Sequence, residues 1–375
     1  MNDKQTANSA IKKKNRQKIL NYIINKGNVP KQELVMHLNL SLPTITQNLT
    51  NLIDDGFIEE TGYANNTGGR SARTYSLKIN ARIAIGLDIT QHHITAVSID
   101  LLGNTISKIR KKITFERTDF YYRKLSETVN ELIQTGNLDT NNLLGIGIGL
   151  PGLINEKGNF VYYGKVMELT NLTLDELTKY IPYPCSLHHD ASVAGFAETW
   201  ISHDIKNAFY ILVNNSLGGS FIYKDMVFTG ENNRSAEIGH VKIVPNGRKC
   251  YCGGYGCVDP YCSVSNLSDI TGGNLETFFE LLKSNNIKAE NLWSEYLSYL
   301  AIAIHNIHML IDCPVIIGGY LGQYMDEYMD KLNSLVSELN PFEEKCSYLH
   351  ICHYKNEAVA VGAALTYIDK FISSI

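Results

Sequence analysis

Residues 237–259 read EIGHVKIVPNGRKCYCGGYGCVD, and this stretch does more than any other to decide the fold of the 375-residue chain. One histidine and three cysteines fall within it, interleaved with glycine. They have the number and type of ligands of a closed tetrahedral zinc site. The glycines allow a backbone turn tight enough to bring the cysteines together. We therefore predict one zinc ion per chain, bound by His240, Cys250, Cys252 and Cys257.

The predicted zinc is structural, because three thiolates and one imidazole fill all four positions of the ion. Glu237 stands three residues before His240. An ion that holds His240 therefore also fixes the position of Glu237. The alternative is a cysteine-rich loop of free thiols.

Composition describes a globular chain without a membrane segment. The sequence is 44% hydrophobic and 19% charged, and no apolar run approaches the roughly 18–20 residues of a membrane span. Residues 1–14 are polar and basic, unlike a secretory signal. Eight cysteines, several in a metal-like cluster, fit a reducing compartment better than a disulfide scaffold. We expect a cytoplasmic protein with no membrane partner.

Charge is unevenly distributed along the chain. Residues 1–80 hold 11 Lys or Arg and 6 Asp or Glu, whereas the whole chain has a net charge of −4. A basic head on an acidic body indicates that only the head meets a polyanion.

The sequence of residues 1–80, the head, predicts three short helices. Apolar residues repeat at helical spacing in residues 15–25, and a second short helix covers residues 31–38. Ser41 can cap a third helix, which carries Pro43 in its first turn and runs to about Asp54. The outward face of this helix is uncharged and hydrogen-bonding, as suits base edges and phosphates. From it we predict DNA contacts by Thr44, Thr46, Gln47 and Asn51.

Two strands, at residues 57–60 and 75–77, follow these helices and predict a winged helix-turn-helix. The segment between them carries Arg70 and Arg73, which we predict to contact DNA in a narrow minor groove or at phosphates. A small helical module for protein–protein contacts is the alternative. The positive charge and the arginines favour double-stranded DNA.

The sequence of residues 81–375, the body, predicts two α/β lobes. Residues 83–89, 94–100 and 105–114 alternate as strands, a helix follows at about 121–134, and a glycine-rich strand covers 144–150. A second set of predicted strands covers residues 208–213 and 217–223, and residues 314–319 are predicted to form another buried strand. Two such lobes leave a cleft between them, in which a ligand should bind.

The chain resembles the ROK family, which comprises repressors, open reading frames and sugar kinases, in its repressor branch. Residues 237–259 resemble the family's E-x-G-H and C-x-C-G-x-x-G-C-x-E zinc motif, and residues 147–152 its G-x-G-x-P-G run. Residues 189–192 (HDAS) resemble its catalytic N-D-A-N, and residues 67–70 (TGGR) the wing of its repressors. The resemblance implies an α/β fold with a two-lobed, actin-like (ribonuclease-H-like) body behind the winged helix-turn-helix.

On this basis we expect three domains. Residues 1–80 form the DNA-binding head. Residues 81–190 form the first lobe, completed by a C-terminal helix at about 356–375, and residues 191–355 form the second lobe with the zinc site.

The resemblance weakens at the two glycine loops with which the family's kinases bind ATP phosphates. The first loop, D-x-G-G-T, reads DITQH at residues 88–92, so both glycines are replaced. The second, G-T-G-x-G-G-G, reads NNSLGGS at residues 214–220. Side chains then occupy the volume that the phosphates need, and phosphoryl transfer depends on that positioning. We expect no enzyme activity and no catalytic residue.

This sequence matches the family's sugar-binding residues better than it matches the two glycine loops. Asp190 matches the base that deprotonates the sugar in the kinases, and would be vestigial here. His189 replaces the family asparagine, and Asp259 replaces a glutamate after the last cysteine. The resemblance implies a sugar or sugar-phosphate site formed by Gly152, His189, Asp190, Glu237, His240 and Asp259.

We therefore expect a sugar-responsive transcriptional regulator that represses carbohydrate-use genes and is released from or altered on its operator by a sugar or sugar phosphate in the lobe cleft. A homodimer or homotetramer would place two recognition helices in successive major grooves of a palindromic operator. Two alternatives stay open: an ATP-dependent sugar kinase fused to a DNA-binding head, and a sensor of a sugar-transport partner protein.

Overall fold

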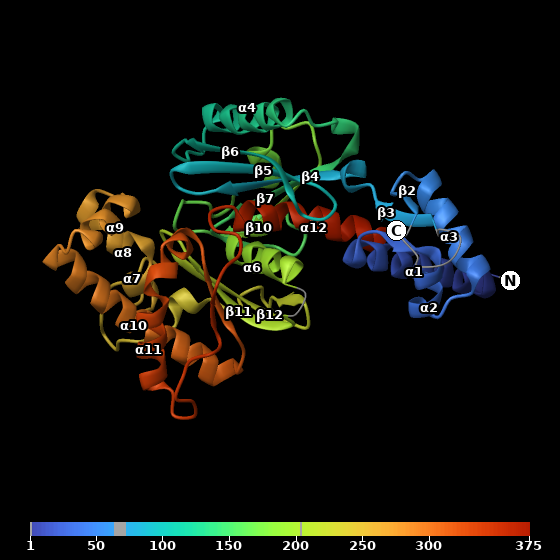
Figure 1. Cartoon of the computed structure of the whole chain (residues 1–375). Coiled ribbons are helices and arrows are strands. Elements are labelled where there is room, and N and C mark those ends of the chain that lie inside the picture. Colours follow the sequence, from blue (N-terminus) through green and yellow to red (C-terminus); the bar gives the residue numbers. More distant parts are fainter. Residues whose placement is uncertain (1, 64–72, 203–204) are drawn as a thin grey trace.

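The structure is a computed structural model, and it describes residues 2–63, 73–202 and 205–375. A small head lies beside the C-terminal end of a two-lobed body (Figure 1). Within the described ranges, no helix combines the length and the apolar character needed to cross a membrane.

The head has the predicted order of three helices and a β-hairpin. It contains α1 (Asn2–Lys26), β1 (Val29–Pro30), α2 (Lys31–Leu38), α3 (Leu42–Asp54), β2 (Ile58–Tyr63) and β3 (Arg73–Leu77), and its sheet has the order β1-β3-β2. The Ser41 side chain accepts a hydrogen bond from the Thr44 amide, which confirms the predicted cap. Ile19, Leu34, Ile45 and Leu52 are fully buried between the helices.

Three details of the head differ from the sequence prediction. Helix α1 begins at Asn2 rather than near residue 15, because its first turns carry no apolar stripe by which a helix can be recognised. The hairpin strands extend further toward the wing than predicted, and the short strand β1 was not predicted.

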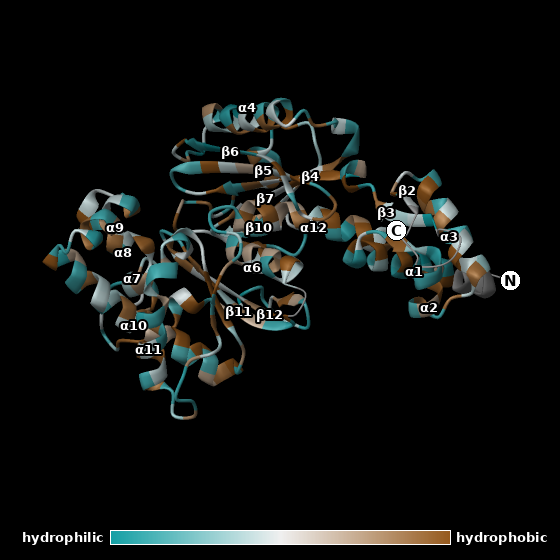
Figure 2. Ribbon diagram, viewed as in Figure 1, coloured by the Kyte–Doolittle hydropathy of each residue, from teal (hydrophilic) through white to brown (hydrophobic). Residues whose placement is uncertain are grey.

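The first lobe is built on a five-stranded sheet of order β10-β7-β4-β5-β6. Strands β4 (Ile83–Ile89), β7 (Leu143–Leu150) and β10 (Cys185–His189) run parallel, while β5 (His93–Ile99) and β6 (Thr105–Lys112) are antiparallel neighbours. Strand β4 is buried along its whole length and is largely brown in Figure 2. Helix α4 (Asp119–Thr135) covers the outer face of β5 and β6.

The second lobe repeats this design with a sheet of order β13-β12-β11-β14-β15. Its strands are β11 (Asn207–Val213), β12 (Leu217–Tyr223), β13 (Met226–Phe228), β14 (Val315–Gly318) and β15 (Leu349–Ile351). The core beneath them contains the fully buried Trp293 and Tyr296 of α10. The helices of this lobe are α7 (Asp259–Cys262), α8 (Val264–Ser268), α9 (Leu275–Lys283), α10 (Ile287–Ile311) and α11 (Met329–Leu339).

Two helices exchange places between the lobes. Helix α6 (Asp190–Ile201) follows β10 but packs on β11 and β12, whereas α12 (Ala358–Ser374) follows β15 but packs on β4 and β7. A methyl group at Gly147 would lie 2.1 Å from the Ala363 carbonyl oxygen, and one at Gly362 would lie 1.8 Å from that of Val193. Only glycine allows these close approaches.

Shorter elements connect the lobes. They are the hairpin β8 (Leu153–Ile154) and β9 (Val161–Tyr163), helix α5 (Leu174–Leu177), and 3-10 turns at Ile79–Ala81, Thr140–Asn142, Ile238–His240, Asp269–Thr271, Tyr320–Gln323 and Met325–Tyr328.

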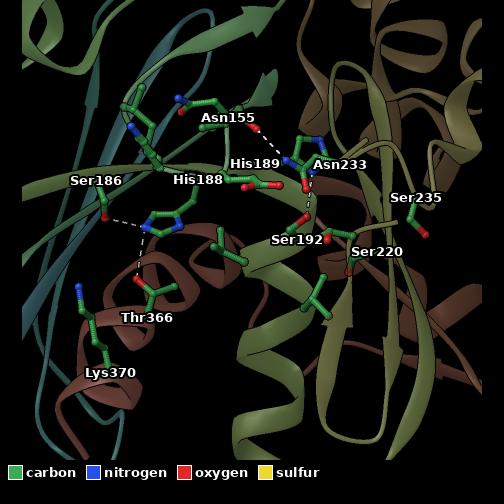
Figure 3. Close-up of a pocket in the computed structure, with 18 of the residues that line it drawn as sticks. Asn155, Ser186, His188, His189, Ser192, Ser220, Asn233, Ser235, Thr366 and Lys370 are labelled. Atoms are coloured by element: carbon green, nitrogen blue, oxygen red, sulfur yellow. Dashed lines mark hydrogen bonds between the residues drawn. The ribbon is translucent and has the colours of Figure 1, made fainter. Parts of the chain in front are cut away.

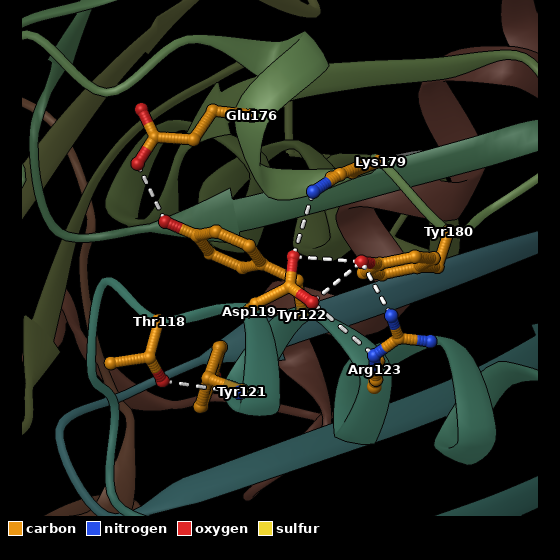
Figure 4. A network of polar contacts seen from close by, with 8 residues as sticks. All are labelled: Thr118, Asp119, Tyr121, Tyr122, Arg123, Glu176, Lys179 and Tyr180. Atoms are coloured by element: carbon orange, nitrogen blue, oxygen red, sulfur yellow. Dashed lines mark hydrogen bonds and ion pairs between the residues drawn. The ribbon is translucent and has the colours of Figure 1, made fainter.

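A polar network fastens the segment after the β8–β9 hairpin to α4 (Figure 4). The Asp119 carboxylate accepts hydrogen bonds from Lys179 Nζ at 2.8 Å and from the Tyr180 hydroxyl at 2.6 Å. Tyr122 donates to Glu176 Oε1 at 2.6 Å. The hydrogen bond from Lys179, followed by that from Tyr180, lowers the pKa of Asp119 to about 2. The network thus anchors one end of the segment that lines the cleft.

Candidate ligand pocket and metal centre

The four predicted metal ligands come together. One ligand atom from each of His240, Cys250, Cys252 and Cys257 can be chosen so that all lie within 4.8 Å of one another. Cys250 Sγ is 3.7 Å from His240 Nδ1, and Cys252 Sγ is 3.9 Å from Cys257 Sγ. A tetrahedral ion with bonds of about 2.0–2.3 Å needs ligand separations of roughly this size. The cluster therefore fits a tetrahedral metal ion.

The backbone turns that shape the cluster depend on glycine. The Cys250 amide donates to the Gly254 carbonyl at 2.8 Å, and the Gly254 amide donates to Cys252 Sγ at 3.4 Å. Gly256 has a φ of 75°, and a side chain there would meet the Val244 carbonyl oxygen at 1.7 Å. A short 3-10 turn, Ile238–His240, then carries His240 to the cysteines.

The cleft pocket forms where three parallel strands end. Asp88 pairs with Gly149 in the β4–β7 register, and His189 pairs with Leu150 in the β7–β10 register. The carboxyl ends of these strands therefore meet at one sheet edge, the usual place for a ligand in an α/β fold. The second lobe closes the pocket with Glu237, His240, Tyr251 and residues 216–218.

The pocket brings together five of the six predicted ligand residues. Gly152, His189, Asp190, Glu237 and His240 all line it. His189 Nε2 is 3.4 Å from Asp190 Oδ1 and 3.9 Å from Glu237 Oε1. Two carboxylates and two imidazoles at this spacing can bind vicinal hydroxyl groups.

Asp259 lies elsewhere. The described residues that line the pocket do not include it, and its side chain is 6% exposed. Asp259 Oδ1 accepts a hydrogen bond from the Leu217 amide at 2.7 Å. Since Leu217 lines the pocket, Asp259 holds the pocket wall from behind. The shorter side chain, compared with the family glutamate, does not reach the cavity.

Asp190 has a second contact within its own helix. Its Oδ1 accepts a hydrogen bond from the Ala191 amide at 2.7 Å, at the first turn of α6. The carboxylate thus lies at the positive end of the helix, where negative charge is favoured.

Two pocket residues were not found from the sequence. The Tyr251 hydroxyl lies 3.3 Å from His240 Nε2, the ring nitrogen that faces away from the cysteines. Lys165 Nζ donates to the Cys252 carbonyl at 3.3 Å, across the cleft from the first lobe. Tyr251 stands between two metal ligands, and this position was the available signal that its side chain could reach His240.

Residues 88–92 and 214–220, which correspond to the two glycine loops of the family's kinases, contact Tyr320. Asn214 Oδ1 accepts a hydrogen bond from the Tyr320 amide at 2.9 Å, and the Tyr320 hydroxyl is 3.5 Å from Thr90 Oγ1. The space between Asp88, Asn214 and Tyr320 has no free volume for a water-sized group. Burial, together with the nearby Asp190 carboxylate, raises the pKa of Asp88 to about 8.

The recognition helix presents its predicted polar face. Thr46, Gln47 and Asn51 are exposed and Thr44 is half-buried. Gln47 Nε2 donates to Asn51 Oδ1 at 3.0 Å, so the two side chains lie side by side on α3. Arg73, on β3, contacts Glu60 at 3.0 Å. Arg70 and the other residues of the predicted wing tip lie outside the described residues.

The head contacts the body through the end of α12. The Phe57 and Phe371 rings meet edge to face with centroids 5.2 Å apart, and the Arg82 guanidinium lies over both rings. Gln17 Nε2 donates to the Ser373 carbonyl at 2.5 Å. Because α12 begins beside Asp88 and Asn214, a single helix reaches from the cleft to the head.

Comparison with family models supplies the identification, since the model of the ROK family matches residues 84–370. The protein belongs to the ROK family. A model described as winged helix-turn-helix DNA-binding matches residues 12–59 of this ROK protein.

The relatives of this ROK protein include repressors. It is 22% identical to the xylose repressor of Staphylococcus xylosus, over 98% of this chain and 97% of the relative. It is 23% identical to the putative xylose repressor of Caldicellulosiruptor sp. (strain Rt8B.4), over 80% and 76%. It is 24% identical to the DNA-binding transcriptional dual regulator NagC of Escherichia coli (strain K12), over 66% and 62%.

Solved structures share the fold of this ROK protein. A ROK family transcriptional regulator, described as a homologue of the E. coli MLC protein, aligns with a TM-score of 0.76 at 22% identity and 97% coverage of both chains. A ROK family glucokinase from Streptomyces griseus, in complex with glucose and AMPPNP, aligns with a TM-score of 0.63 at 20% identity, over 76% of this chain and 98% of that chain.

Proposed function

We propose that this ROK protein is a sugar-responsive transcriptional repressor of carbohydrate-use genes. The observation that carries the proposal is the presence, in one chain, of a winged helix-turn-helix and a polar cleft pocket linked by α12. A sugar bound by Asp190, Glu237 and His240 would change the angle between the lobes. This change would reach the head through α12 and would alter the spacing of two heads on DNA.

A sugar can act in this way only if it binds one conformation better than the other. The cleft offers such a difference, because its two sides come from different lobes and hydrogen bonds cross it. Lys165 donates to the Cys252 carbonyl, and the Tyr162 hydroxyl donates to the Asn232 carbonyl at 2.9 Å. A ligand that rearranges these contacts shifts the relative position of the lobes.

We propose zinc as the resident metal and a structural role for it. The donor set of three thiols and one imidazole is of the type that zinc prefers, and it leaves no open coordination position. His240, one of these four residues, lies with Glu237 on one wall of the pocket. Burial lowers the pKa of His240, which favours the neutral imidazole that a metal requires.

We further propose that the protein acts in the cytoplasm as a homodimer or homotetramer on a palindromic operator. Residues 1–80 would form the head. Residues 81–190 with 356–375, and residues 191–355, would form the two lobes. The exchange of α6 and α12 between the sheets supports these bounds.

Catalysis by a kinase is disfavoured by the contacts at the phosphate loops. Asn214 Oδ1 accepts a hydrogen bond from the Tyr320 amide, and the space beside these residues and Asp88 has no free volume for a water-sized group. A partner-protein sensor is the remaining alternative.

The direct experiment selects operator DNA from random duplexes with the full-length, zinc-loaded protein, and then adds sugars to the complex. We expect at least one sugar to weaken operator binding by about 5- to 150-fold. The proposal fails if no duplex is enriched, or if every sugar leaves operator binding unchanged while ATP and a sugar yield ADP. Capture of a transport protein that alone releases the DNA would favour the partner-sensor alternative.

A further inference from the structure

A second and larger cavity adjoins the cleft pocket, and we call it the outer pocket. Its volume is about 620 Å³, within the roughly 300–1,000 Å³ typical of small-molecule sites. The cleft pocket itself has only about 50 Å³ of free volume. Figure 3 shows that the side chains around the outer pocket come from the first lobe, the second lobe and α12.

The two pockets share a wall formed by His189 and Glu237, which line both. The His189 ring has one nitrogen on each side. Its Nδ1 is 3.1 Å from Ser192 Oγ, which lines the outer pocket, and its Nε2 faces Asp190 and Glu237 in the cleft pocket. A ligand that occupies both pockets would therefore meet the same imidazole from both sides.

The lining of the outer pocket is polar and largely uncharged. Hydroxyl and amide groups come from Asn155, Ser192, Ser220, Asn233 and Ser235. Ser220 is 1% exposed, and its Oγ has no hydrogen-bond partner within the described part of the chain. A buried hydroxyl without a partner is costly, but Ser220 Oγ has almost no exposed surface, so a hydroxylated ligand would pair with the more accessible groups of Asn155, Ser192, Asn233 and Ser235.

An aromatic ring completes the lining. Phe228 lines the outer pocket and is 53% exposed. An exposed aromatic face beside neutral hydrogen-bonding groups suits a sugar ring, which has apolar C–H faces and polar hydroxyl edges. Charged side chains occur at the rim, where Glu156, Lys157 and Lys370 are exposed. Burial lowers the pKa of His188 to about 4, so this imidazole adds no positive charge to the lining at neutral pH.

We propose that the outer pocket is a second sugar subsite, and that the effector is a neutral disaccharide or glycoside with one unit in each pocket. This inference rests on the proposed function and narrows its ligand class. The glycosidic link would lie beside the His189–Glu237 pair, and the 3.9 Å contact between His189 Nε2 and Glu237 Oε1 would have to open to admit it. A phosphate on the unit in the cleft pocket would be repelled by the Asp190 and Glu237 carboxylates, and Lys165, which also lines this pocket, already donates to the Cys252 carbonyl.

The free volume of the cleft pocket is too small for a sugar ring, so the inner unit requires a lining side chain to move. Tyr251 lines the pocket and is 41% exposed, and its rotation would break the edge-to-face contact of its ring with His240. The Tyr251 hydroxyl would then leave His240 Nε2, and a sugar hydroxyl would take its place.

The test measures binding by isothermal titration of the full-length, zinc-loaded protein. The ligands are glucose and xylose, disaccharides built from each of them (maltose, cellobiose, sucrose and xylobiose), and glucose 6-phosphate. We expect at least one disaccharide to bind about 10-fold or more tightly than its component monosaccharides. Glucose 6-phosphate should bind no more tightly than glucose.

Two variants locate the second unit. Phe228→Ala and Ser235→Ala should each weaken disaccharide binding about 3- to 10-fold and leave monosaccharide binding unchanged. Phe342→Ala is the matched control, because Phe342 is 82% exposed and lines neither pocket. Melting temperatures equal to that of the parent protein establish that each variant folds.

The inference is overturned if monosaccharides bind as tightly as disaccharides and the outer-pocket variants change nothing, although the proposed function would survive. It is also overturned if glucose 6-phosphate binds best and Lys370→Ala removes that preference. If none of these sugars binds and none releases operator DNA, the proposed function itself fails.

Discussion

At the scale of single residues, the preserved chemistry of this ROK protein is concentrated around one histidine. His240 offers Nδ1 to the cysteine cluster, while its Nε2 faces the pocket and Tyr251. The proposed metal and the proposed ligand would therefore lie on opposite sides of one ring. Asp259 contributes indirectly, through the Leu217 amide.

Removal of one metal ligand tests this arrangement. Cys252→Ser should lower the bound zinc from about one ion per chain to nearly none. It should also lower the melting temperature by about 5–10 °C, because metal binding contributes free energy of folding. Elemental analysis and calorimetry provide the two readouts. Cys346→Ser, at a half-buried cysteine outside the cluster, should retain the metal; equal metal loss in both variants would argue against the assigned ligands.

Asp88 gives a prediction with a defined pH dependence. Its folded-state pKa is raised from 3.8 to about 8, mainly by burial. The protonated carboxyl therefore favours the folded state fully below about pH 4, and this contribution is lost as pH rises through about 8. Asp88→Asn, which cannot ionise, should be more stable than the parent at pH 8 by at least about 1 kcal/mol.

Denaturant unfolding of both proteins between pH 5 and pH 8 checks this expectation. The stability difference between Asp88→Asn and the parent should grow with pH. The exposed Asp175→Asn should show no such trend. A difference that is constant with pH would mean that Asp88 does not titrate in this range.

At the scale of elements, the strongest local patterns were sufficient for prediction. Helix α3 was predicted from its Ser41 cap and apolar spacing, and the central strands of both sheets from their apolar runs, whereas β10, β13 and β15 were not predicted. Helix α1 was predicted too short, because its early turns lack an apolar stripe. The outer pocket was not predicted, since it forms between segments far apart in sequence. The place of Asp259 behind Leu217 was not predicted, because its hydrogen bond to the Leu217 amide joins residues far apart in sequence.

The recognition face of α3 can be tested by truncation. Gln47→Ala should weaken binding to the selected operator by about 1–3 kcal/mol, or roughly 5- to 150-fold in Kd. Binding to unrelated DNA should be unchanged, because that binding depends on phosphate charge. Fluorescence anisotropy at fixed salt measures both. Gln32→Ala, at an exposed residue of α2, is the matched control; an equal loss on all DNA would remove Gln47 from base recognition.

Helix α12 carries the proposed signal, and its far end can be weakened without touching the cleft. Phe371→Ala removes the ring that meets Phe57. We expect an unchanged Kd for the sugar, but a sugar-induced change in operator affinity of less than about 3-fold. If the parent and the variant respond equally to the sugar, the signal does not pass through this contact.

At the scale of the whole molecule, two lobes of the same strand order enclose the cleft pocket, and their exchanged helices tie each lobe to the other. Asn214 hydrogen-bonds to Tyr320 at one end of the cleft, whereas carboxylates and the Cys/His cluster form the wall of the cleft pocket. This combination supports the proposed regulator, in which a ligand-driven movement of a kinase-like cleft would move a DNA-binding head.

Such coupling must be reciprocal. If a sugar weakens operator binding by a given factor, saturating operator DNA must weaken sugar binding by the same factor. The most direct measurement is therefore the Kd of the best sugar for the full-length protein, with and without saturating operator. We predict that the operator raises this Kd by about 5- to 150-fold, by the same factor with which the sugar raises the Kd of the operator. A sugar Kd that is identical with and without operator would contradict the account.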